Sequence, residues 1–215
     1  MAQISLLTLP QAFSYAGVAL FAATGAMAAA RRKHDVVTFV FFAVITGLGG
    51  GTLRDLLLGQ PVFWVRDPVQ LAIAACTGLG VWLVGFREKD QRLLNWPDAI
   101  GLSAFAVLGA DKALALHVSP LVAAPMGVLT ATAGGIIRDI TAGEPSVLLN
   151  REIYITAALV SAAAYVVGQP LVGADAASLV AFGAGAALRI AAMLFGWTLP
   201  SYAGGVLGRA LGSKG

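Results

Sequence analysis

Apolar residues occur along this chain in long runs separated by short polar stretches, a pattern typical of membrane-spanning helices. A helix needs about 20 residues to cross the hydrocarbon core of a bilayer. Segments of roughly that length lie at residues 12–30, 36–57, 69–86, 97–116, 120–141, 153–170 and 176–196. Counts of six or eight stay open, because glycines blur the limits of the second and fifth segments. The pattern predicts an all-α integral membrane protein with seven transmembrane helices.

Composition supports this interpretation. Of 215 residues 58% are apolar and 12% are charged, and the mean hydropathy is +0.82, far from the values of a soluble domain. The net charge of +3 is small and the basic residues form no stripe, which argues against nucleic-acid binding. Cys76 is the one cysteine, so an intrachain disulfide is excluded.

The loop charges predict an orientation. No Lys or Arg precedes the first apolar run and three basic residues follow it, which indicates a retained helix and not a cleaved signal. One side of the membrane receives Arg31, Arg32, Lys33, Arg87, Lys89, Arg92, Arg151, Arg209 and Lys214. The other side receives Arg66 and Lys112. The positive-inside rule then predicts an outside N-terminus and a cytoplasmic tail at residues 197–215.

A repeat appears when the chain is compared with itself at an offset of 84 residues. The two copies of its motif are Gly50-Gly51-x-x-Arg54-Asp55 and Gly134-Gly135-x-x-Arg138-Asp139, followed by Gly59-Gln60-Pro61 and Gly143-Glu144-Pro145. Residues 12–86 and 97–170 thus form two three-helix repeats, and residues 176–196 form a seventh helix. Because three is odd, the second repeat enters the membrane from the opposite face. Inverted repeats of this kind are typical of transport proteins.

The glycines of the motif are expected near the middle of the membrane. Gly49 lies about 20 Å along its helix, past the centre of the hydrocarbon core. Glycine weakens helices, and opened backbone at this depth is tolerated when it is buried or lines a wet cavity. We therefore expect pore bends at Gly49, Gly50, Gly51, Gly134 and Gly135. Close helix packing at small residues is the alternative.

The charges of the motif are candidate pore residues. Ionisable groups inside a membrane usually face a bundle interior or water and pair with one another. Neighbours on a helix point about 100° apart, so Arg54 can meet Asp139 or a carbonyl group in place of Asp55. Arg54, Asp55, Arg138 and Asp139 are accordingly either polar pore lining or structural clamps at helix ends.

Other charges near apolar segments have simpler expectations. Lys112 is either a gating charge or a lysine that snorkels to the membrane surface. Arg189 is expected to snorkel, and Asp98 to occupy the first turn of the fourth helix without a transport role. His34 and His117 are isolated, and no cysteine and histidine cluster has metal-ligand spacing. Nothing predicts an enzyme, a metal site or a cofactor.

The doubled motif in this setting resembles the prokaryotic branch of the TRIC family, the trimeric intracellular cation channels. The resemblance covers residues 10 to 196. It implies a homotrimer in the plasma membrane, surrounded by lipid. Each protomer would have its own water-filled pathway for K⁺, with Na⁺ as the second candidate. By position, the glycines would be the bends, and Arg54, Asp55, Arg138 and Asp139 the lining or clamps. Ala133 replaces the first glycine of the second triplet, so its bend is expected to be milder.

Two alternatives to a channel remain at this stage. Related sequences carry a glycine-transporter label, so a carrier of a small amino acid such as glycine could use the same inverted repeats. The sequence lacks a polar cluster at mid-depth that would hold such a substrate, which favours the channel. A membrane scaffold without transport would leave the intramembrane charges without a role.

Overall fold

The computed structural model describes residues 8–85, 91–146 and 153–199, which fold into a bundle of helices. The helices are α1 (Leu9–Arg31), α2 (Val36–Leu57), α3 (Phe63–Arg66), α4 (Pro68–Val84), α5 (Gln91–Ala115), α6 (Pro120–Ala142), α7 (Ile155–Val172) and α8 (Ala174–Phe195). Helix α3 is a single turn that the sequence did not predict. Each of the other seven overlaps one predicted apolar segment. Five of them, α1, α2, α6, α7 and α8, are long and apolar enough to cross a membrane, and α4 is a shorter apolar helix of 17 residues.

Helix α5 begins earlier than predicted. The sequence placed its start at residue 97 because of Pro97, but the helix runs from Gln91 and contains Pro97 inside it. The expectation that Asp98 occupies a first turn is therefore wrong. Asp98 lies within the helix, buried at 3% exposure.

Local signals explain several helix boundaries. The side chain of Asp35 accepts a hydrogen bond of 2.9 Å from the backbone N–H of Thr38 at the start of α2, which lowers the pKa of the Asp35 carboxyl. Gly143 ends α6 in the left-handed conformation that glycine adopts without steric cost. Lys33 and His117 take positive φ angles of 54° and 58° after α1 and α5. They stand 84 residues apart, so the repeat extends to the backbone of the loops.

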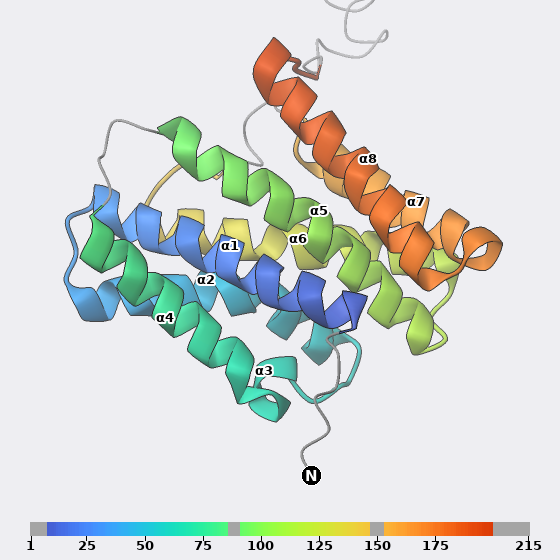
Figure 1. Cartoon of the computed structure of the whole chain (residues 1–215), viewed down its shortest axis with the longest axis horizontal. Coiled ribbons are helices and arrows are strands. Elements are labelled where there is room, and N and C mark those ends of the chain that lie inside the picture. The colour runs from blue at the N-terminus through green and yellow to red at the C-terminus, as the bar shows by residue number, and fades with distance from the viewer. Residues whose placement is uncertain (1–7, 86–90, 147–152, 200–215) are drawn as a thin grey trace, which may run out of the picture.

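The bundle has two groups of three long helices (Figure 1). Helices α1, α2 and α4 pack on one another, and α5, α6 and α7 do the same. The two groups meet through α1 against α5 and α2 against α6, while α8 lies beside α7 and also contacts α5. The interior where the groups meet is built from small and aromatic apolar side chains.

The contacts between the two groups are reciprocal. A Cβ atom placed on Gly17 of α1 would lie 2.5 Å from the ring of Phe105 in α5, and one on Gly101 of α5 would lie 3.0 Å from the ring of Phe21 in α1. Equivalent positions thus exchange equivalent contacts, as in an interface with two-fold symmetry. Because the lower number on one helix meets the higher number on the other, α1 and α5 run antiparallel.

Several charges behind the predicted orientation lie outside the described residues. These are Arg87, Lys89, Arg151, Arg209 and Lys214, and the predicted tail is described only as far as residue 199. The orientation in the membrane thus stays a prediction.

Candidate functional site

The motif glycines mark the place where α2 and α6 approach each other. A Cβ atom on Gly134 would lie 2.5 Å from the carbonyl oxygen of Thr46, and one on Gly50 would overlap the carbonyl oxygen of Thr130. Thr46 and Thr130 are themselves 84 residues apart, so this contact is reciprocal as well. The backbones of the two helices therefore touch, with the helices antiparallel.

The glycines do not interrupt either helix. Helix α2 is continuous through Gly49, Gly50 and Gly51, and α6 is continuous through Gly134 and Gly135. Neither helix opens its backbone in the structure, where Gly50 and Gly134 instead allow close contact between the two helices. Bends at these positions stay a prediction for a conducting state.

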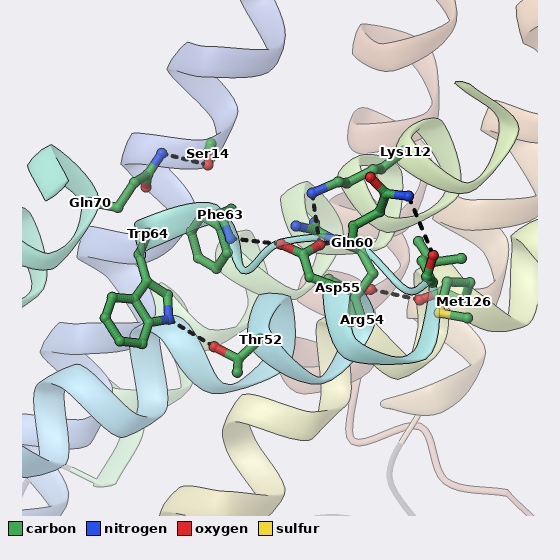
Figure 2. Close-up of polar contacts among 12 residues, drawn as sticks. Ser14, Thr52, Arg54, Asp55, Gln60, Phe63, Trp64, Gln70, Lys112 and Met126 are labelled. Carbon is green, nitrogen blue, oxygen red and sulfur yellow. Dashed lines mark hydrogen bonds and ion pairs between the residues drawn. The ribbon is translucent and has the colours of Figure 1, made fainter. Parts of the chain in front are cut away.

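A charged cluster, called here the Asp55 cluster, lies at the C-terminal end of α2 (Figure 2). The Oδ1 atom of Asp55 accepts hydrogen bonds of 2.7 Å from both Nε of Arg54 and Nζ of Lys112, and its Oδ2 atom accepts one of 2.8 Å from the backbone N–H of Phe63. Asp55 is fully buried, whereas the Lys112 side chain is 32% exposed. The guanidinium of Arg54 also lies over the ring of Phe63, with 5.6 Å to its centroid.

Helix α3 forms because the Asp55 cluster holds its first residue. Phe63 is the first residue of α3, and its backbone N–H would otherwise have no helical partner. Next to it, Nε1 of Trp64 donates a hydrogen bond of 2.9 Å to the hydroxyl of Thr52 on α2. The short helix is thereby attached to the end of α2, beside the charges (Figure 2).

A second charged cluster, called here the Arg138 cluster, lies at the C-terminal end of α6. Arg138 donates from Nε to Asp139 at 2.9 Å, and from Nη1 to Asp98 at 2.6 Å and to the hydroxyl of Thr24 at 3.1 Å. The Arg138 residue is only 2% exposed. These contacts join α6 to α5 and α1, so the cluster spans both groups of helices.

Arg189 lies close to the Arg138 cluster. Its guanidinium lies over the ring of Tyr154, 5.1 Å from the centroid, and the residue is 2% exposed. The hydroxyl of Tyr154 points toward the Arg138 cluster, since a Cβ atom on Gly135 would lie 2.9 Å from it and 3.9 Å from Oδ1 of Asp98. The expectation that Arg189 snorkels to the membrane surface is wrong, because the ring and the helices around it enclose its charge.

The two clusters are equivalent in position and different in charge. Each contains an arginine that binds the aspartate next to it through Nε, and each lies four residues beyond its glycine contact. The Asp55 cluster combines one carboxylate with two cations, one of them the half-exposed Lys112. The Arg138 cluster surrounds one guanidinium with two carboxylates, and all three groups are buried. The Asp55 cluster therefore carries an excess positive charge at the edge of the protein, whereas the charged groups of the Arg138 cluster are shielded from solvent.

Sequence reasoning identified the arginines and aspartates of both clusters but not their partners. Of the partners left open for Arg54, which were Asp55, Asp139 and a carbonyl group, the structure shows Asp55. Lys112 pairs with Asp55 across the two groups, and neither of its predicted roles includes that contact. Sequence reasoning did not foresee the residues that join or adjoin the Arg138 cluster, which are Asp98, Thr24, Tyr154 and Arg189. An aspartate and an arginine inside apolar runs were the available signal, because such charges need partners.

No group of three or more metal-ligating side chains occurs among the described residues. The two clusters consist of paired charges that already satisfy one another. Their arrangement offers no nucleophile beside a base.

Comparison with known proteins places the chain among bacterial membrane proteins. The family described as "Glycine transporter" matches twice, over residues 11–86 and 95–170, which begin 84 residues apart. The inner membrane protein YadS of Escherichia coli (strain K12) is 37% identical over 87% of this chain and 93% of its own length. The membrane protein YvgT of Bacillus subtilis (strain 168) is 33% identical over 87% of this chain and 94% of its own length.

Solved structures are similar over most of the chain. The TRIC trimeric intracellular cation channel orthologue from Rhodobacter sphaeroides superposes with a TM-score of 0.85 at 41% identity, over 88% of this chain and all of the other. A structure that accounts for conductance through TRIC cation channels gives a TM-score of 0.81 at 33% identity, over 90% of this chain and 97% of its own.

Proposed function

Because the chain belongs to the prokaryotic TRIC family, whose sequence unit is described as a glycine transporter, we propose that it is a channel for monovalent cations. K⁺ is the expected ion and Na⁺ the second candidate. The proposed assembly is a homotrimer in the plasma membrane with one pathway in each protomer. The structural relatives are named as cation channels, which supports a channel over a carrier.

The observation that carries this proposal is the reciprocal, antiparallel contact between α2 and α6, with a charged cluster beyond it on each helix. Antiparallel equivalence is what two repeats of opposite membrane orientation produce, and pathways in such proteins lie at the repeat interface. Ionisable groups buried at membrane depth commonly mark ion pathways.

In the proposed arrangement all seven long helices cross the membrane. Residues 12–86 and 97–170 are the inverted repeats, residues 176–196 are the seventh helix, and residues 197–215 are the cytoplasmic tail. With the N-terminus outside, α2 ends outside and α6 ends in the cytoplasm. The Asp55 cluster then lies at the outer end of the pathway and the Arg138 cluster at the cytoplasmic end.

The motif residues have separate proposed roles. Arg54, Asp55, Arg138 and Asp139 line the two ends of the pathway and clamp the ends of their helices. The glycines of α2 and α6 allow these helices to bend when the channel opens, because glycine accepts backbone angles that other residues resist. Bending would turn carbonyl oxygens toward the ion, as in other cation pathways.

The first prediction concerns transport itself. We expect purified protein in liposomes to pass K⁺ down its gradient and to show no saturable uptake of labelled glycine, because an open channel conducts passively while a carrier saturates. Fluorescent measurement of K⁺ flux and a filter assay for glycine on the same liposomes test both functions. Empty liposomes are the control. Saturable glycine uptake without K⁺ flux would replace the channel with the carrier.

The second prediction concerns Lys112, proposed as the gating charge. Voltage-driven opening would move its ammonium away from Asp55, and one charge crossing the whole field is worth about 2.3 kcal/mol per 100 mV. Replacing Lys112 with glutamine is expected to flatten the dependence of open probability on voltage, measured on single channels in planar bilayers. The control is Arg66→Gln, which removes an exposed cation near the same end. An unchanged slope in Lys112→Gln would leave Lys112 a purely structural partner of Asp55.

A further inference from the structure

Two phenylalanine rings, one from each group of helices, stack at the centre of the bundle. Phe21 of α1 and Phe105 of α5 stand 84 residues apart, and their ring centroids are 5.1 Å apart with 21° between the planes. Phe21 is 0% exposed and Phe105 is 4% exposed. Because the two positions are equivalent in the repeats, the stack lies where the groups meet.

Glycines form the surfaces on which these rings lie. The ring of Phe105 covers Gly17 and the ring of Phe21 covers Gly101, both too closely for a Cβ atom to fit without displacing the ring. Phe21 also lies beside α6, since a Cβ atom on Gly134 would be 3.8 Å from its Cδ1 atom. The stack therefore fills the space next to the contact between α2 and α6.

The stack separates the two charged clusters. Arg54 follows Gly50 by four residues and Arg138 follows Gly134 by four, a rise of about 6 Å along each helix. Because α2 and α6 are antiparallel, the clusters lie in opposite directions from the rings. An ion that passes from one cluster to the other must cross the level of the phenylalanines, where the stacked rings present apolar surface.

We propose that Phe21 and Phe105 are the pathway residues that close the channel, as a hydrophobic gate at the junction of the repeats; this proposal rests on the proposed channel function. Apolar constrictions stop ions by excluding water, without blocking the passage by charge. Rotation of the rings away from the glycine surfaces opens the passage. Water admitted there would also hydrate the hydroxyl of Thr46, which is buried without a hydrogen-bond partner among the described residues.

Truncation of the rings tests the gate. Phe21→Ala and Phe105→Ala are each expected to raise passive K⁺ flux in liposomes roughly tenfold or more, because water can then fill the centre. The matched control is Phe39→Ala, since Phe39 is also buried and lies in α2 where its backbone carbonyl is beside Gly78 of α4. That variant loses a ring of the same size and is expected to leave the flux unchanged.

A second measurement tests the gate if a truncated variant fails to fold. Phe105→Cys, made together with Cys76→Ala, places the chain's one thiol at the gate. A positively charged methanethiosulfonate reagent is expected to modify it from the water phase and to reduce the K⁺ flux of this variant.

The outcomes separate the gate from the channel. Wild-type K⁺ flux together with unchanged flux in both alanine variants, or with an unmodified cysteine, would overturn the gate and leave the channel standing. If the wild type and all gate variants fail to pass K⁺, the channel function itself fails. Equal increases in Phe39→Ala and Phe105→Ala would indicate leakage from general loosening of the core, which also overturns the gate.

Discussion

Arg138→Gln is expected to lower the free energy of unfolding by about 3–5 kcal/mol, the cost of removing one partner from a buried charge network. Arg138 is the cation bound to both Asp98 and Asp139 in its cluster, and it is almost completely enclosed. Glutamine has similar length but no charge, so two carboxylates would stay buried without the guanidinium between them. Thermal unfolding of the detergent-solubilised protein, followed as the fraction that stays monodisperse after heating, measures the loss.

The equivalent position in the other repeat supplies a matched control. Arg54→Gln is expected to cost about 1.5–3 kcal/mol, the range for a hydrogen bond to a charged group, because Lys112 still neutralises Asp55. Combining Arg54→Gln with Lys112→Met removes both cations and should bring the loss up to that of Arg138→Gln. Asp98→Asn in the Arg138→Gln background should restore part of the stability, since it removes one of the two carboxylates that Arg138 binds. Equal losses in the two single variants would contradict the difference between the clusters.

The long helices could be predicted from the sequence because each is a long, mostly apolar run bounded by polar, proline or glycine residues. The motif recurs at one fixed offset without gaps, which is why the sequence predicts a repeat. Helix α3 could not be predicted, because four residues are too few to show a helical pattern of apolar positions. It depends on the Asp55 carboxylate, which binds its first N–H group.

The partners of the motif charges were beyond sequence reasoning for a different reason. Residue spacing predicts that successive side chains leave a helix about 100° apart. It does not predict how each side chain then rotates about its own bonds. Arg54 bends back to its neighbour Asp55, where a lysine 57 positions away joins them. Such a triad forms only when two helices from different repeats meet, and a single sequence does not reveal that meeting.

The glycines illustrate the same limit. Weak helix propensity predicts bends in α2 and α6, and these bends stay a prediction. In the structure both helices continue through the motif, and Gly50 and Gly134 bring their backbones into contact. The sequence did contain a signal for this contact. Thr46 and Thr130 precede Gly50 and Gly134 by one helical turn each and repeat at the same offset, as an antiparallel reciprocal contact requires.

The two ends of the proposed pathway need not open at equal cost. Separating Lys112 from Asp55 exposes an ammonium group that already touches solvent. Opening the Arg138 cluster would expose buried charges that hydrogen bonds connect across α1, α5 and α6. Desolvated charge pairs resist separation more strongly than half-hydrated ones. We therefore expect the end at Asp55 to respond first to a stimulus.

Gly50→Ala is expected to destabilise the contact between α2 and α6, although it adds one methyl group. The new Cβ atom would overlap the carbonyl oxygen of Thr130, and a backbone atom cannot rotate away as a side chain can. Helices α2 and α6 would have to separate at the point where the repeats meet. Overpacking of this kind costs about 1–3 kcal/mol or more, against a gain of about 1 kcal/mol from better helix propensity.

Matched glycines separate this contact from helix propensity. Gly80→Ala in α4 and Gly183→Ala in α8 place a methyl group in open space, so each should be neutral or stabilising. Gly134→Ala should resemble Gly50→Ala, because its Cβ atom would lie 2.5 Å from the carbonyl oxygen of Thr46. Thermal unfolding and K⁺ flux, measured on all four variants, test the prediction. Wild-type stability and flux in Gly50→Ala would show that α2 and α6 lie farther apart in the membrane than their contact at Thr130 requires, and the proposed pathway at the repeat interface would lose its main support.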